Sequence, residues 1–380
     1  YCTDQQRYDT VHCLGNPHIH TPNLDKLVEN GVAFTRAYTQ CPICTPSRAT
    51  LLTGRYPATH HVHRNGADYF PPHEVLVTKM LAQAGYDCGL AGKLHLSRAK
   101  GRVEKRPDDG YRVFHWSHHP MPDWSKGHAY AGWLRDEKKI EPQEIWSPLR
   151  GLVYGPGVPE AYHQTTWCTE MAIRFINEQR DGPWLMSLNP FDPHPPFDPP
   201  AEYMARYDAQ ELPYPLFQES DIEHQKKFAA IDQQTRGATN PYLSYDDAAS
   251  ALDRNTDTAS VPPAHYDARQ VKACYYGMIE LIDRQLGRII DVLEESGQRE
   301  NTIIIFTSDH GELLGDHGLL YKGCRFFEGL VHVPLIISYP SRFQKNLHSQ
   351  ALVELVDLAP TVLEAVGLSA PEFMQGKSLV

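Results

Sequence analysis

Four short polar segments combine carboxylate, imidazole and ammonium groups, the side chains that bind cations and transfer protons. They are Asp4-Gln5, Lys93-Leu94-His95, Asp192-Pro193-His194 and Asp309-His310. Each segment alone is weak evidence, because an aspartate after a strand is more often a turn or cap residue. Their common position is more informative, since each one follows an apolar run that resembles a buried strand.

These polar segments are predicted to meet at one edge of a sheet. The apolar runs before them are Tyr1-Cys2-Thr3, Tyr86–Ala91, Trp184–Asn189 and Thr302–Thr307. In open α/β sheets, ligands bind outside the carboxyl ends of the strands. The sequence therefore predicts one polar site that is assembled from both ends of the chain.

A fifth segment, Cys41 to Arg55, carries the most specific signal. Thr45 is a favourable N-cap, Pro46 suits the first helical position, and Gly54 is a helix stop. This pattern predicts that Cys44 lies just before a helix N-terminus, where free N–H groups and the helix dipole favour an anion. A sulfate or phosphate group bound there would contact Cys44.

Cys41 and Cys44 also form a C-x-x-C pair, which has two other interpretations. Such a pair is found in redox motifs and as half of a zinc site. The sequence has no second C-x-x-C pair, which argues against a zinc ribbon, and a redox motif does not require the Pro46-Ser47-Arg48 that follows. The eight cysteines are otherwise scattered, as in a reduced protein with buried thiols.

The elements that must position these segments alternate between strand-like and helical patterns, which indicates an α/β fold. A helix is predicted to start at Pro22 with Thr21 as its cap, and to stop at Gly31. A long helix is predicted near Asp267–Ser296. Two stretches, 100–165 and 195–265, lack periodicity, and we expect them to be insertions that shape the mouth of the site.

Composition and charge exclude some classes of partner. The formal net charge is -11 and no basic stripe is present, which argues against nucleic acid. An anionic substrate would therefore need a local basic pocket. No apolar run is long enough to span a membrane. We expect the chain to be trimmed at both ends, at Tyr1 and Val380, so the compartment stays open between cytoplasmic and periplasmic or secreted.

The segment Cys44-Thr45-Pro46-Ser47-Arg48, followed by Leu52-Thr53-Gly54-Arg55, resembles the C-x-P-S-R…T-G-R signature of the sulfatases, members of the alkaline phosphatase superfamily. Further similar segments are Asp4–Asp9, Thr21–Asp25, Ser308–Gly318 and Val356–Thr361. The resemblance implies one catalytic domain over residues 1–380. It also implies a large mixed, mostly parallel sheet sandwiched by helices, with the family's smaller C-terminal subdomain largely absent.

The same resemblance implies that Cys44 is oxidised to formylglycine by a maturation enzyme, a transient partner. In the family, the hydrated aldehyde is a geminal diol. One of its oxygens attacks sulfur and the ester oxygen leaves. The second hydroxyl then loses its proton, and sulfate is expelled as the aldehyde forms again. This is covalent catalysis with a built-in release step.

Family roles carry over to individual residues. Asp4, Gln5, Asp309 and His310 are implied to hold a divalent cation together with an oxygen of modified Cys44. Calcium is the family's usual ion and suits oxygen ligands, with Mg²⁺ and Mn²⁺ as alternatives. Many members have Asp in place of Gln5 and Asn in place of His310, so this site is less negative and has one more nitrogen.

The remaining roles concern charge and proton transfer. Arg48 and Lys93 are implied to orient the diol and neutralise charge, and Lys322 to contact the sulfate. One of His95 and His194 is implied to act as base or acid. Together these residues supply the basic pocket that the acidic surface lacks, and such electrostatic stabilisation is usually the largest catalytic term.

Three hypotheses about function remain open at this point. The leading one is a sulfuric ester hydrolase that acts on a sulfated sugar or an aryl sulfate. The second is a phosphonate monoester or phosphodiester hydrolase on the same scaffold. The third is a catalytically silent binding protein. It requires the loss of a metal-ligating residue or of the nucleophile, and the sequence retains all of these residues.

Overall fold

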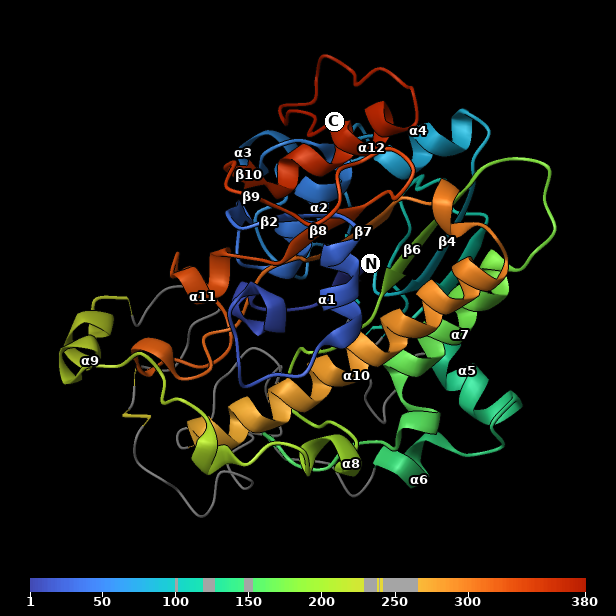
Figure 1. The fold of residues 1–380 in the computed structure, drawn as a ribbon. Coiled ribbons are helices and arrows are strands. Elements are labelled where there is room, and N and C mark those ends of the chain that lie inside the picture. Colours follow the sequence, from blue (N-terminus) through green and yellow to red (C-terminus); the bar gives the residue numbers. More distant parts are fainter. Residues whose placement is uncertain (100–101, 119–126, 147–152, 229–237, 239, 242–265) are drawn as a thin grey trace.

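The computed structural model describes residues 1–99, 102–118, 127–146, 153–228, 238, 240–241 and 266–380. Figure 1 shows strands between two groups of helices, as the α/β pattern predicts. Among these residues, no helix combines the length and the apolar character that crossing a bilayer requires.

The described strands form three hydrogen-bonded sheets. The five-stranded sheet has the order β1 (Cys2–Thr3), β7 (Ile304–Ser308), β8 (Leu335–Ser338), β2 (Val32–Phe34) and β9 (Leu347–Ser349). The second has the order β5 (Val113–Trp116), β4 (Asp87–Gly92) and β6 (Trp184–Asn189), and the third pairs β10 (Val353–Glu354) with β3 (Ala37–Tyr38). Strand β8 is antiparallel to β7 and β2, and all the other pairings are parallel. The predicted class, a mixed and mostly parallel α/β fold, is confirmed.

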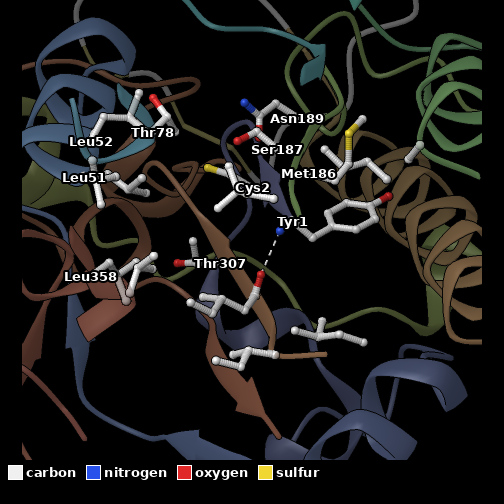
Figure 2. Close-up of a pocket in the computed structure, with 18 of the residues that line it drawn as sticks. Tyr1, Cys2, Leu51, Leu52, Thr78, Met186, Ser187, Asn189, Thr307 and Leu358 are labelled. Carbon is white, nitrogen blue, oxygen red and sulfur yellow. Dashed lines mark hydrogen bonds between the residues drawn. The ribbon is translucent and has the colours of Figure 1, made fainter. Parts of the chain in front are cut away.

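The two larger sheets are neighbours, but no ladder joins them within the described part of the chain. Strand β1 pairs with β7 over only two residues and lies beside β6 without a ladder between them. Next to β1, a largely apolar cavity of about 210 Å³ separates the Ile303–Ile305 edge from Trp184–Met186. Figure 2 shows Tyr1 in this gap, where its amino group donates to the carbonyl of Ile305 at 2.7 Å. The expected large sheet is therefore divided at β1.

One face of the sheets is covered by α1 (Pro22–Glu29), α5 (Ala129–Asp136), α7 (Gln164–Ile176) and α10 (Ala268–Glu295), with α6 (Pro142–Trp146) beside α5. Helix α10 is the long diagonal helix of Figure 1 and packs against α7 and α1. It begins where the sequence predicts, because the carboxylate of Asp267 accepts the N–H groups of Arg269 and Gln270.

The other face is covered by α2 (Cys44–Thr53), α4 (Val77–Gln83) and α12 (Leu358–Ala365), which enclose a second apolar core with β4. Short helices complete the described elements. They are α3 (Pro57–His60), α8 (Ala201–Met204), α9 (Glu219–Lys226) and α11 (Glu328–Val331). The site therefore lies in a fold whose strands are covered by helices on both faces.

The two stretches expected to lack regular structure contain helices and a strand. Strand β5 and helices α5 and α6 lie within 100–165, and α8 and α9 lie within 195–265. Helix α5 forms because Tyr130, Trp133 and Leu134 recur at helical spacing and are buried together. Residues 100–101, 119–126, 147–152, 229–237, 239 and 242–265 lie outside the described residues.

Candidate active site

Polar residues from four strands meet at one edge of the sheets. Asp4 and Gln5 follow β1, and Asp309 follows β7. The N–H of Gln5 donates to Oδ1 of Asp309 at 3.0 Å, and the N–H of Asp4 donates to the carbonyl of Asp192 at 3.1 Å. Lys93 follows β4 in the same way. The carboxyl ends of strands from distant parts of the chain therefore build one site, as expected for an open α/β sheet.

Helix α2 brings Cys44 to this edge, although it begins two residues earlier than predicted. Cys44 is the first helical residue, Ile43 is the cap, and the Thr45 side chain caps nothing. Instead, the N–H of Thr45 donates to Oδ1 of Asn65 at 2.9 Å. The predicted Thr45 cap is therefore wrong, because a distant asparagine supplies the acceptor. Gly54 ends the helix at φ 66, as predicted.

The Cys44 thiol is buried among charged groups. Its Sγ atom lies 3.0 Å from Nζ of Lys322, 3.2 Å from Nε2 of His310 and 3.6 Å from Oδ1 of Asp4. Burial and Asp4 raise the pKa of this thiol, but Lys322, Lys93 and His310 outweigh both and lower it to about 5.

Four ligand-type side chains converge here, and Cys44 is one of them. One donor atom from each of Asp4, Cys44, Asp309 and His310 lies within 4.8 Å of the others, and all four residues are buried. Nδ1 of His310 lies 2.9 Å from the carbonyl of Gly311, which can only accept, so in the neutral ring Nε2 keeps its lone pair toward the cluster. Carboxylate oxygens with one imidazole fit a divalent cation.

Gln5 joins this cluster through its side-chain oxygen. Oε1 of Gln5 accepts from Nζ of Lys322 at 2.7 Å, and the same ammonium contacts Cys44. A positive group thus already lies between two of the proposed donors, which indicates that their electrostatic environment suits a cation. Gln5 also has φ 74, a left-handed conformation uncommon for a residue with a side chain.

Two further cationic side chains flank the cluster. Nε of Arg48 donates to Oδ2 of Asp309 at 2.8 Å, and Nη1 donates to the carbonyl of Lys93 at 3.0 Å. The ammonium of Lys93 contacts the carboxylate of Asp4 and lies 5.1 Å from the ring centre of Phe191. Nη2 of Arg48 is buried and has no hydrogen-bond partner among the described atoms. It lies 4.0 Å from Oδ2 of Asp4, which is beyond hydrogen-bond distance.

Charge explains the state of Asp4. Burial raises the pKa of Asp4, but Lys93, His194, Arg48 and Lys322 together hold it well below its usual range. Asp4 is therefore ionised at neutral pH and is able to act as a cation ligand.

His95 lies beside the cationic side chains and is held by Glu104. The N–H of His95 donates to Oε1 of Glu104 at 2.6 Å, and Nε1 of Trp116 donates to the same oxygen at 2.7 Å. Burial and the charges of Lys93 and Arg48 hold the pKa of His95 well below its usual range. Its Nδ1 atom is buried and unpartnered among the described atoms. A neutral imidazole with a free ring nitrogen can accept a proton.

His194 lies on the loop after β6, on the same side of the site. Its Nδ1 atom lies 2.8 Å from the carbonyl of Pro195, and its ring packs on Phe191 at a centroid distance of 4.4 Å. A chain of ring contacts joins the two candidate histidines. The centre of the His118 ring lies 4.4 Å from that of His95 and 6.0 Å from that of Phe191, on which His194 packs. We name His95, His118, Phe191 and His194 the aromatic rim, which links the ends of β4, β5 and β6.

Sequence reasoning missed Glu104 and Glu312. Both are buried carboxylates that bind residues of the site. Glu104 accepts the backbone N–H of His95, and Glu312 accepts from Nε2 of Gln5. Glu312 was visible inside the segment Ser308–Gly318 that resembles the family, but nothing in its spacing indicated a role. Glu104 lies in an aperiodic stretch with no local signal.

Comparisons with known proteins show to which family the sequence and the fold are similar. The sequence matches the sulfatase family over residues 2–368. It is 31% identical to the multifunctional alkaline phosphatase superfamily protein PehA of Trinickia caryophylli, over 99% of this chain and 75% of that protein. It is 30% identical to an arylsulfatase of Clostridium perfringens, over 99% of this chain and 76% of that protein. The crystal structure of a phosphonate monoester hydrolase of Agrobacterium radiobacter superposes with a TM-score of 0.81 at 27% identity, and the match covers 100% of this chain and 75% of that one.

Proposed function

The chain belongs to the sulfatase family of hydrolases, and on that premise we propose that it hydrolyses sulfate monoesters and releases inorganic sulfate. The observation that supports this proposal most directly is the cluster of Asp4, Cys44, Asp309 and His310. One ligand atom from each lies within 4.8 Å of the others, next to buried cationic side chains. In this proposal Cys44 is oxidised to formylglycine, whose hydrated aldehyde supplies the attacking hydroxyl.

The proposed cation, with calcium as first choice, is held by Asp4, Gln5, Asp309, His310 and the modified Cys44. When bound, it lowers the negative charge of these groups and polarises nearby oxygens. Two carboxylates and two neutral side chains make this donor set less negative than a cage of four acidic residues. Manganese or magnesium therefore remain reasonable occupants of the same site.

Cationic side chains of this chain are proposed to bind the substrate anion. Nε of Arg48 donates to Asp309. Nη2 has no hydrogen-bond partner among the described atoms, although it lies 4.0 Å from Oδ2 of Asp4, and it is proposed to bind a substrate oxygen. Lys322 contacts Cys44 directly, so it is placed to bind an oxygen of a sulfate group there. Preorganised charges of this kind, buried away from water, stabilise the charge that develops in the transition state.

Proton transfer is proposed for the two histidines. Nδ1 of His95 has no hydrogen-bond partner among the described atoms, so His95 is proposed as the base that takes a proton during sulfate release. His194 lies across the aromatic rim and is proposed to bind sulfate or to protonate the leaving group. His118 is the one member of the rim that is not buried, and its ring is proposed to contact a sugar ring or an aryl leaving group.

A phosphonate monoester is the second candidate substrate, because of the likeness to the phosphonate monoester hydrolase. Sulfate monoesters, phosphonate monoesters and phosphodiesters are all tetrahedral esters that carry one negative charge at neutral pH. The charges around Cys44 therefore suit all three. Phosphate monoesters carry a second charge and are expected to be poor substrates.

A panel assay separates these candidates. We expect kcat/KM for an aryl sulfate or a sulfated saccharide to exceed that for an aryl phosphonate monoester and an aryl phosphodiester by at least about tenfold, or 1.4 kcal/mol of transition-state binding. Each substrate is measured with the same matured, cation-loaded enzyme, and an aryl phosphate monoester serves as the dianionic control. Faster turnover of the phosphonate would replace the first proposal with the second.

The two histidines are distinguished by their dependence on the leaving group. With an activated aryl sulfate, His194→Ala should lose less than about tenfold in single-turnover rate, because a good leaving group does not need an acid. With a sulfated sugar, the same variant should lose about 10²–10⁴-fold. His95→Ala should slow the regeneration step on both substrates, which is measured as accumulation of covalently bound sulfate.

His332→Ala is a matched control, because His332 is a half-buried histidine that is stacked on Tyr8 and Tyr38 and has no proposed role. Its rates should stay within about threefold of the unaltered enzyme. Equal losses for His95→Ala and His194→Ala on both substrates would rule out this division of labour.

A further inference from the structure

Glu312 is a buried carboxylate beside the candidate cation site to which none of the roles above assigns a function. Its Oε2 atom accepts from Nε2 of Gln5. Its Oε1 atom accepts the N–H groups of Leu313 at 2.9 Å, Leu314 at 3.1 Å and Tyr321 at 2.5 Å. All of these partners are donors, so both oxygens of Glu312 act as acceptors.

The side-chain amide of Gln5 lies between this acceptor and a donor. Nε2 of Gln5 faces Glu312, and Oε1 accepts from Nζ of Lys322 at 2.7 Å. The two ends of an amide have nearly the same shape, so the hydrogen-bond partners decide which end points where. In the reversed orientation the amide oxygen would face a carboxylate and the NH₂ group would face an ammonium, and both contacts would be repulsive.

We propose that Glu312 is a positioning residue that turns the Gln5 amide so that its oxygen, and not its nitrogen, faces the cation. An amide nitrogen has no lone pair to offer, so this orientation decides whether Gln5 is a ligand at all. An aspartate at position 5 would have oxygens at both ends and would not need such a partner. The inference rests on the proposed function, because it requires a cation at this site.

Glu312→Gln tests the proposal with little change in size. The new amide keeps an oxygen for the three backbone N–H groups but turns its own NH₂ toward Gln5, so the Gln5 amide reverses. Affinity for Ca²⁺ and for Mn²⁺, each alone, is measured by titration calorimetry on the full chain. We expect both to weaken by about 10–100-fold, the usual effect of removing a partner that orients a ligand.

The exchange Gln5→Glu with Glu312→Gln provides a rescue. The amide at position 312 then donates to one oxygen of the carboxylate at position 5, and the other oxygen faces the cation. This variant has the same side-chain types and net charge as the original pair. Its affinity should return to within about threefold of the native chain. Circular dichroism shows whether Glu312→Gln alone folds. If it does not, the cation affinity of the exchange variant still tests the proposal.

Tyr275→Phe is the matched control. It removes the hydrogen bond from the tyrosine hydroxyl to the Gln5 carbonyl, 2.7 Å long, but leaves both partners of the amide in place. Cation affinity should change by less than about threefold. A native chain that bound neither cation would overturn the proposed site together with this inference. Native binding that Glu312→Gln leaves intact, or that the exchange does not restore, would overturn the inference alone.

Discussion

Replacing Cys44 with alanine is expected to lower kcat/KM by at least about 10⁴-fold without loss of the fold, because the change removes the proposed nucleophile. The thiol is buried and contacts Lys322 and His310, so it lies at the centre of the charged cluster. Alanine fits the same space, and we expect the circular dichroism spectrum to stay unchanged.

The same residue has a chemical signature. In enzyme produced together with a formylglycine-generating maturation enzyme, the peptide that contains Cys44 should lack one sulfur and two hydrogens and should contain one additional oxygen. Mass spectrometry of that peptide is the measurement. Fully active enzyme that contained only unmodified cysteine would refute the proposed nucleophile.

Cys41→Ala is the matched control for both measurements. Cys41 is a free thiol three residues before Cys44 and outside the segment that resembles the family signature. Conversion of Cys44 and activity should remain within about twofold of the unaltered enzyme. Loss of activity in this variant would instead favour the redox or zinc interpretation of the C-x-x-C pair.

Residues at the ends of strands were predictable from the sequence. An apolar run that ends in a polar segment marks the carboxyl end of a buried strand, and Asp4, Lys93 and Asp309 all fit this pattern. Helix α10 was predicted within one residue at each end because apolar side chains recur along it and Gly297 follows it. These signals are local, so a single sequence contains them.

Features that depend on partners from distant positions were not predictable. Asn65 supplies the acceptor at the start of α2, Glu104 holds the His95 turn, and Glu312 contacts Gln5. Each contact joins residues that only the folded chain brings together. The division of the sheet at β1 was not predictable either. It depends on how far β1 runs beside β6 and β7, which the composition of these strands does not determine.

Asp309→Ala should remove both the bound cation and the activity, the second large effect that we expect. Oδ1 of Asp309 accepts the N–H groups of Gln5 and His310, and Oδ2 accepts from Nε of Arg48. Alanine deletes a proposed charged ligand. It also leaves the buried Arg48 guanidinium without its hydrogen-bonded carboxylate, so that its nearest carboxylate is Asp4 at 4.0 Å. Breaking a buried ion pair typically costs about 3–5 kcal/mol, so the free energy of unfolding should fall as well.

The measurements are cation content by elemental analysis, kcat/KM and denaturant unfolding. Cation content should drop below about one tenth of an equivalent, and kcat/KM by at least about 10³-fold. Asp309→Asn keeps an acceptor for the backbone N–H groups, so it should unfold at higher denaturant than Asp309→Ala and still bind the cation weakly. This variant separates loss of the ligand charge from loss of the fold.

Asp283→Ala distinguishes a ligand from an ordinary buried carboxylate. Asp283 is as buried as the site residues, but it caps the start of α1 by accepting the N–H groups of Asn23 and Leu24. Its removal should lower the free energy of unfolding by about 1–3 kcal/mol and leave one cation bound, because it lies at the helix start and not among the donors. If Asp309→Ala retained its cation while Asp283→Ala lost it, the cluster around Cys44 would not be the cation site. The buried arginine and lysines would then have to balance the charge of the substrate alone.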